Sequence, residues 1–225
     1  MILAIDTTSE FGSLALADGP NVVEVVPLHS REGFGHLIFQ EIVALLDRHN
    51  LKLADLEGYA AASGPGSFTG VRIGLTAAKG LAEAHGKRVV PVSNLLALAY
   101  GVGQAFLPVR AAVINASRGE LYGAAYDADL RPVVEEVVTT WPRFLYLLSD
   151  REAAFATTDP GFVQAGVAGT RFESAPVVTV PPALAGPVAA LAARAFAEGR
   201  ALLPEEVDAN YVRRSDAELL WKENP

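Results

Sequence analysis

Residues 61–74 read Ala-Ala-Ser-Gly-Pro-Gly-Ser-Phe-Thr-Gly-Val-Arg-Ile-Gly. This stretch connects an apolar run at residues 56–62, which predicts a buried strand, to residues 71–84, which predict a helix. Its glycines permit positive φ angles and a close approach to another backbone. Ser67 or Thr69 would cap the helix. Exposed amides at such a helix start are suited to binding an anion.

Two interpretations of this loop stay open on the sequence. The loop is either an anion site or a tight strand-to-helix turn whose glycines serve packing alone, and its spacing favours the turn. The phosphate-binding loop pattern is absent, because no Gly-Lys-Ser/Thr follows. The G-x-G-x-x-G pattern is also absent, because the spacing of Gly64, Gly66 and Gly70 differs from it by one position.

The composition is that of a globular protein. The chain has 225 residues, of which 51% are hydrophobic and 20% charged, and a net charge of −8. This acidic balance argues against a chain that grips nucleic-acid phosphates by itself. With no cysteine, disulfides, thiolate zinc sites and a cysteine nucleophile are excluded, and a cytoplasmic location fits. We expect neither a signal peptide nor a membrane span, because the apolar runs are too short.

The predicted elements form two similar series. The first has strands at 2–6, 13–17, 22–28, 56–62 and 88–93, and helices at 35–50, 71–84 and 94–104. The second restarts near residue 106, with strands at 110–115, 120–126, 133–139, 153–157 and 177–180, and helices at 142–149 and 187–198; residues 161–169 are ambiguous. Each series opens with a three-stranded meander that has a polar first corner, at Asp6 and at Asn115. This topology predicts an internal duplication with domains at residues 1–104 and 105–225.

The first corner carries Asp6, Thr7 and Thr8. A carboxylate and hydroxyls at a strand end, together with Ser67, could hold a metal-bound phosphate. The same residue types also form turns that satisfy their own backbone, and in isolation that interpretation is favoured. His29 and His36 are seven residues apart with no third ligand nearby, so we predict no metal site there.

Small residues follow the glycine loop along the predicted helix. Gly70, Gly74, Ala77 and Ala78, with Leu81, would form a face that another helix can approach closely, either within the chain or from a partner. Arg72 would be a polar anchor beside this face or would pair with a carboxylate of the chain. In the tail, Tyr211 and Arg213 would contact another chain or belong to a solvated terminus.

Five segments together resemble the TsaB (YeaZ) family, in that family's order. They are residues 2–8 (ILAIDTT), 64–74 (GPGSFTGVRIG), 78–81 (AKGL), 118–122 (RGELY) and 211–213 (YVR). The resemblance implies an α/β fold of two tandem domains that face each other across a cleft. This is the actin-like, sugar-kinase-like fold, which belongs to the ribonuclease H-like group.

The resemblance also implies partners. TsaB-like proteins pair with a TsaD-like transferase in making threonylcarbamoyladenosine in tRNA, a TsaE-like ATPase joins that pair, and members form homodimers through the first domain. We expect the helices at 70–81 and 35–50 to form the partner interface, with Arg72 as its polar anchor. His36 matches a histidine common in such chains, although the segment after it departs from their usual Leu-Leu-Pro pattern. Contact with tRNA would be indirect.

The same comparison favours a subunit without catalytic residues. Superfamily members that handle ATP usually carry an acid at both corners, whereas the second corner here is Asn115, and an amide cannot neutralise a metal ion. We therefore expect a scaffold and activator without a cofactor, with which weak ATP or ADP binding at a complex interface is compatible. One alternative is an ATP-dependent small-molecule kinase or ATPase that uses Asp6 and Ser67. A weaker one is a glycoprotease-like peptidase, for which a nucleophile, metal pair and zincin helix are lacking.

Overall fold

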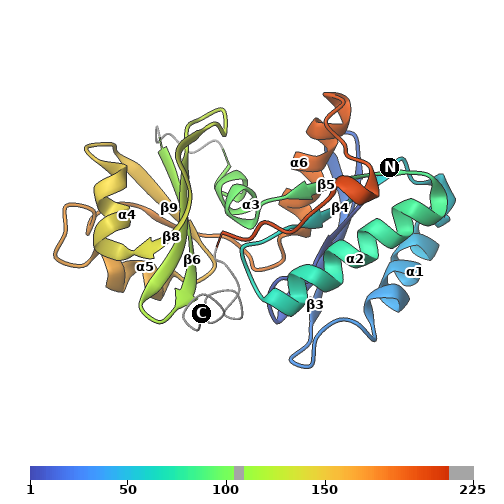
Figure 1. Ribbon diagram of the computed structural model, residues 1–225, viewed down its shortest axis with the longest axis horizontal. Helices are drawn as coiled ribbons and strands as arrows, with labels where there is room; N and C mark the ends of the chain where they lie inside the picture. Colours follow the sequence, from blue (N-terminus) through green and yellow to red (C-terminus); the bar gives the residue numbers. More distant parts are fainter. Residues whose placement is uncertain (104–108, 213–225) are drawn as a thin grey trace, which may run out of the picture.

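The chain folds into two five-stranded mixed sheets (Figure 1). The computed structural model describes residues 1–103 and 109–212. The first sheet has the strand order β3-β2-β1-β4-β5, and the second has β10-β9-β6-β7-β8. If the strands are numbered within each half, both sheets have the order 3-2-1-4-5, with the second sheet read from its β8 edge. The α/β class and the duplicated topology predicted from the sequence are therefore confirmed.

The first half begins with the predicted meander. Its first strand pairs antiparallel with the second and parallel with the fourth, so the carboxyl ends of the first and fourth strands meet at one edge. The strands are β1 Ile2–Asp6, β2 Phe11–Asp18, β3 Asn21–His29, β4 Gly58–Ala62 and β5 Arg88–Val92. The helices are α1 Ile38–Arg48, the short η1 Leu53–Asp55, α2 Phe68–His85 and α3 Asn94–Gly101.

The second half repeats this pairing scheme. Its strands are β6 Val109–Ser117, β7 Glu120–Tyr126, β8 Pro132–Thr140, β9 Ala153–Thr157 and β10 Val177–Thr179. Its helices are α4 Trp141–Leu148, α5 Pro160–Val167, α6 Ala185–Ala197 and the short η2 Pro204–Glu206. The ambiguous residues form α5, which begins at a Pro with an Asp159 side-chain cap. Gly166 is required there, because a Cβ at this position would overlap the Trp141 ring.

Each half contributes a helix to the sheet of the other half. Helix α6 packs on the first sheet, with its alanines against Ala4, Ala15 and Ala60. Helix α3 packs on β6 and β7 of the second sheet and also contacts α6. The second domain predicted from the sequence, residues 105–225, includes α6, which packs on the sheet of the first half. Figure 1 shows α3 between the two sheets.

The two faces of the first sheet explain this exchange. Side chains alternate along a strand, so Leu3 and Ile5 meet α1 and α2 while Ile2 and Ala4 face the opposite side. Both faces are apolar, and both must be covered by a helix. Alanines on the sheet and on α6 let the two backbones approach closely. No helix among the described residues has the length and apolar character that crossing a membrane requires.

Ala189→Leu tests the close approach of α6. Ala189 is fully buried in α6, so extra methylene groups would force the helix away from the sheet. We expect a loss of about 1–3 kcal/mol in the free energy of unfolding, measured by urea denaturation. Ala84→Leu, on the exposed side of α2, is the control and should change that free energy by less than about 0.5 kcal/mol. Equal effects of both substitutions would contradict the packing described.

Candidate functional site

The glycine loop packs against the first corner of the chain. A Cβ at Gly66 would lie 2.7 Å from the Thr8 carbonyl oxygen, and one at Gly74 would lie 2.7 Å from Thr7 Oγ1. A Cβ at Gly70 would overlap the Thr7 carbonyl oxygen. The backbone confirms the contact, because the Ser67 amide donates to the Thr8 carbonyl at 2.7 Å. These glycines therefore serve close packing inside the chain.

Most of the small-residue face of α2 is internal, so this part of the expected partner interface is not accessible in the isolated chain, although Ala77 also lines an outer groove. Gly70, Gly74, Ala77 and Ala78 are buried, and Leu81 is half-buried against the same core. A helix that lies on a sheet must bury one side, and its smallest side chains allow the closest approach. The side of α2 available to a partner is therefore the opposite one, which carries Arg72.

Asp6 is the centre of a buried polar network. Its Oδ1 accepts hydrogen bonds from the Thr8 amide at 3.0 Å and from Thr8 Oγ1 at 2.7 Å. Its Oδ2 accepts from the Leu184 amide at 3.3 Å, at the start of α6. Only 1% of Asp6 is exposed. Burial raises the pKa of the Asp6 carboxyl, and the hydrogen bonds from Thr8 and Leu184 oppose that rise.

Asn94, which the sequence analysis missed, extends this network to the glycine loop. Its Oδ1 accepts from the Gly64 amide at 3.0 Å, and its Nδ2 donates to Thr8 Oγ1 at 2.5 Å. One network thus connects Gly64, Asn94, Thr8, Asp6 and Leu184. One sequence signal could have identified Asn94. It follows Ser93 at the end of a predicted strand, where polar side chains frequently cap the next helix.

The residues considered for phosphate binding make hydrogen bonds within the chain, and two of them, Thr7 and Ser67, also line a pocket of about 340 Å³. Asp6, Thr7 and Thr8 are buried, and Thr7 Oγ1 donates to the Gly70 carbonyl at 2.7 Å. Ser67 is exposed, and its Oγ caps α2 by accepting from the Gly70 amide at 3.3 Å. At the second corner, exposed Asn115 accepts from the Ser117 amide at 2.8 Å. In residues 1–103 and 109–212, no three His, Asp or Glu side chains gather as a metal site.

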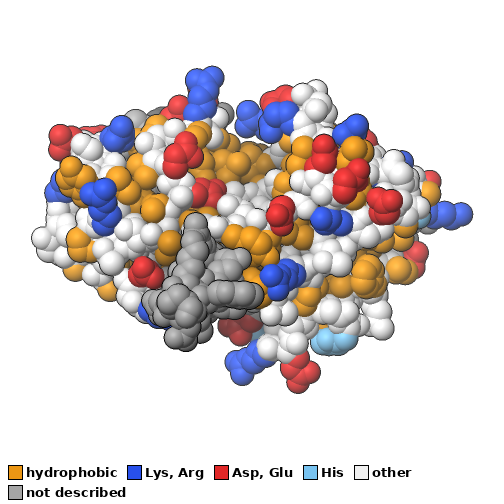
Figure 2. All heavy atoms as spheres, in the orientation of Figure 1, with side chains coloured by type: hydrophobic (Ala, Val, Ile, Leu, Met, Phe, Trp, Pro, Cys, Tyr) orange, Lys and Arg blue, Asp and Glu red, His pale blue; other side chains and the backbone are white. Residues whose placement is uncertain are grey.

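An apolar groove of about 440 Å³ lies between α1 and α2 on the outer surface. Phe39 and Phe68 line it with 52% and 44% of their surface exposed, and Val43, farther along α1, is 52% exposed. Figure 2 shows hydrophobic side chains over the region of these two helices. His36 is exposed beside Gly35, a lining residue. Contiguous exposed apolar surface of this kind is typical of an interaction site.

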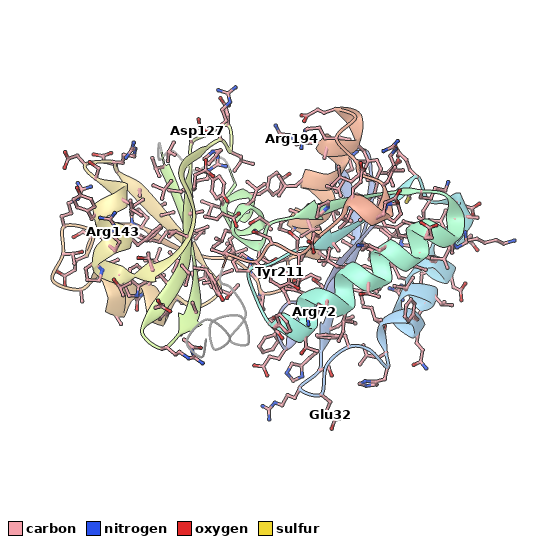
Figure 3. The ribbon with its side chains drawn as sticks, in the orientation of Figure 1. Glu32, Arg72, Asp127, Arg143, Arg194 and Tyr211 are labelled. Carbon is pink, nitrogen blue, oxygen red and sulfur yellow. The ribbon has the colours of Figure 1, made fainter. Side chains whose placement is uncertain are left out.

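Arg72, which lines this groove, contacts two aromatic rings. Its guanidinium carbon lies 3.5 Å from the centre of the Phe68 ring, and its Nε donates to the Tyr211 hydroxyl at 3.1 Å. The Phe68 and Tyr211 rings are 5.9 Å apart. Figure 3 shows Arg72 and Tyr211 beside the start of α2. Tyr211 thus contacts its own chain, whereas Arg213 lies outside the described residues.

Known sequences resemble this chain over parts of its length. The family model described as TsaD: tRNA N6-adenosine threonylcarbamoyltransferase matches residues 24–162. A curated TsaB protein of Escherichia coli is 38% identical over 129 residues, which cover 57% of this chain and 55% of that protein. The Bacillus subtilis TsaB protein is 33% identical over 125 residues, with 56% and 54% covered. The matches therefore span about half the length of these curated relatives.

Solved structures resemble it over nearly the whole chain. A structure described as similar to peptidase YEAZ, from Pseudomonas aeruginosa, has a TM-score of 0.80 and 26% identity, and covers 94% of this chain and 99% of its own. A Listeria monocytogenes protein, described as an N-acetylmannosamine kinase, has a TM-score of 0.51 and 12% identity, with 88% and 99% covered, and shows the fold alone. The chain therefore belongs to the TsaB (YeaZ) family and has the actin-like fold that this family shares with sugar kinases.

Proposed function

We propose that this chain is a non-catalytic subunit in the threonylcarbamoyladenosine modification of tRNA. It pairs with a TsaD-like transferase, and a TsaE-like ATPase joins the pair. The names of its relatives support the pathway, since the curated matches are called tRNA threonylcarbamoyladenosine biosynthesis proteins. The exposed apolar groove between α1 and α2 is the observation that carries the pairing.

The groove has the composition of a docking surface. Phe39, Val43 and Phe68 are large apolar side chains that water contacts in the isolated chain. Arg72 supplies a planar charged group at the edge, and buried aromatic and arginine anchors carry most of the energy in many interfaces. A stable interface buries roughly 1,600 Å² in total, so it would extend over both helices.

A TsaD-like paralogue suits this surface because it is related in sequence. A TsaD protein of Methylocapsa acidiphila is 41% identical over 71 residues, which cover 32% of this chain and 20% of that protein. A related pair of helices on the paralogue would pack against α1 and α2. A second copy of this chain would use the same groove symmetrically, so the homodimer and the pair with the paralogue would compete. Location in the cytoplasm and indirect contact with tRNA remain predictions.

The arrangement of the first corner supports the non-catalytic interpretation over a kinase or ATPase. A catalytic carboxylate must reach a metal-bound phosphate, whereas both oxygens of Asp6 accept hydrogen bonds from the chain. Weak ATP or ADP binding at an interface with a partner stays a prediction. Calorimetry with ATP and magnesium on the isolated chain separates the two functions, since the kinase requires binding that Asp6→Ala abolishes.

Phe39→Asp tests the docking surface directly. A carboxylate at this lining position of the groove would have to lose its hydration on association. We expect association with the TsaD-like paralogue to weaken by about 30-fold or more, measured by isothermal titration calorimetry. The reconstituted tRNA modification should fall with it.

Phe11→Asp is the matched control, because Phe11 is 43% exposed on β2 and does not line the groove. It should leave both association and tRNA modification unchanged. Equal effects of the two substitutions would contradict this position of the interface. Full tRNA modification in the absence of the chain would contradict the activator role itself.

Asp6→Asn tests the structural role of the buried carboxylate. The pKa of Asp6 is raised above 3.8 in the folded chain. At pH values between 3.8 and this raised pKa, Asp6 is therefore protonated in the folded chain and ionised in the unfolded chain. Relative to the Asn variant, the native chain should therefore lose stability as pH rises from 3.8 until Asp6 of the folded chain is also deprotonated. Urea denaturation at several pH values measures this difference. A difference that is constant or that grows in favour of the native chain would contradict the burial of Asp6.

A further inference from the structure

Residues 207–212 form a strap that runs from the first half of the chain toward the second (Figure 1, red). Its start is anchored on the first half. Leu202 and Val89 exchange two backbone hydrogen bonds of 2.9 Å just before the strap begins. Within the strap, the Val207 carbonyl accepts from Lys79 Nζ of α2 at 2.7 Å.

Asn210 of the strap joins the two halves. Its amide donates to the carbonyl of Ser63, directly after β4, at 2.8 Å. Its side-chain Nδ2 donates to Glu136 Oε2 of β8 at 2.6 Å. The glycine loop accommodates the strap, because Gly64 has a φ of +104° and a Cβ there would lie 3.2 Å from the Asn210 carbonyl oxygen.

Two further hydrogen bonds hold the Glu136 side chain in position to accept from Asn210. Its Oε1 accepts from Ser93 Oγ and, at 3.1 Å, from the Tyr126 hydroxyl. These donors and Asn210 Nδ2 are uncharged groups that fix both carboxylate oxygens of a half-buried side chain. The bridge forms one wall of a cleft of about 460 Å³ that Leu96 and Leu130 also line. A change in the position of one half relative to the other would therefore strain or break the Asn210–Glu136 bond.

The next residue of the strap contacts the docking surface. Tyr211 accepts from Arg72 Nε and packs beside Phe68, and both of these residues line the groove between α1 and α2. Tyr211 itself does not line the groove, so it orders Arg72 from the edge without filling the space for a partner. Two consecutive residues, Asn210 and Tyr211, thus connect the interdomain cleft with the proposed docking surface.

We propose that the strap couples the relative position of the two halves to the order of the docking surface. The inference rests on the proposed function for the identity of the partner. When Asn210 bridges the halves, Tyr211 holds Arg72 and Phe68 in place, so a partner loses less side-chain freedom on binding. Because coupling between two sites is reciprocal, a bound partner also stabilises the Asn210–Glu136 bridge.

Asn210→Asp and its rescue by Glu136→Gln test this coupling. The single variant places two carboxylates at hydrogen-bonding distance, whereas the double variant restores a bond with donor and acceptor exchanged. Association with the TsaD-like paralogue should weaken by about fivefold in the single variant and recover in the double variant. Asn21→Asp adds the same charge at an exposed position and should leave association unchanged.

Spin labels measure the position of the halves independently. The chain has no cysteine, so Glu83→Cys on α2 and Glu173→Cys in the second half, both exposed, can be labelled selectively. Asn210→Asp should broaden the distance distribution between these labels, and the double variant should narrow it again. An unchanged distribution would overturn the bridge. A broadened distribution with unchanged association, or a failed rescue, would overturn the coupling.

The NMR resonance of the Arg72 Nε–H in the isolated chain separates failure of this inference from failure of the proposed function. If the native chain does not associate with the paralogue, the proposed function fails, and the isolated chain still tests the strap. There, the NMR resonance of the Arg72 Nε–H should shift in Asn210→Asp and return in the double variant. Tyr146→Phe, a tyrosine beside Arg143 on the far half, should not move it. An Arg72 resonance that ignores Asn210→Asp would overturn the proposal.

Discussion

The contact between the start of α2 and the corner after β1 determines the arrangement of the first half. Gly66, Gly70 and Gly74 have no side chains where Thr7 and Thr8 meet them, so a helix lies directly on the end of a strand. That contact fixes which side of α2 is internal. Large side chains such as Phe68 and Arg72 are left on the outer side, where they line the groove with α1. The proposed docking surface therefore lies on the side of α2 that does not carry the glycines.

The polar network around Asp6 depends on the same contact. Asp6, Thr8 and Asn94 connect the corner, the glycine loop and the start of α6 through buried hydrogen bonds. The residue types at this corner suggest a phosphate site. Here its carboxylate accepts hydrogen bonds from an α6 amide and from Thr8, and buried polar groups of this kind are stabilising only when they are paired. The corner thereby fastens to the first sheet the helix that the second half contributes.

The sequence predicted most of the elements but not their long-range contacts. Periodicity and turn residues are local signals, and they located β9 at Ala153–Thr157 and the three-stranded meander that begins each half. The packing of α6 on the first sheet could not be found in this way, because the contact joins residues far apart in the chain. The same holds for Asn94 and for the pairing of Asn210 with Glu136. The small residues of α2 were recognised as a contact face, but a pattern of small side chains does not distinguish an internal face from an external one.

We propose that a partner covers the outer face of α1 and α2, while the glycine face stays inside. Hydrogen–deuterium exchange of the chain with and without the TsaD-like paralogue tests this most directly. Added protection should be concentrated in Ile38–Arg48 and in the first turns of Phe68–His85, with no change around Asn115 at the second corner. Protection centred on the second corner, with α1 and α2 unchanged, would contradict it.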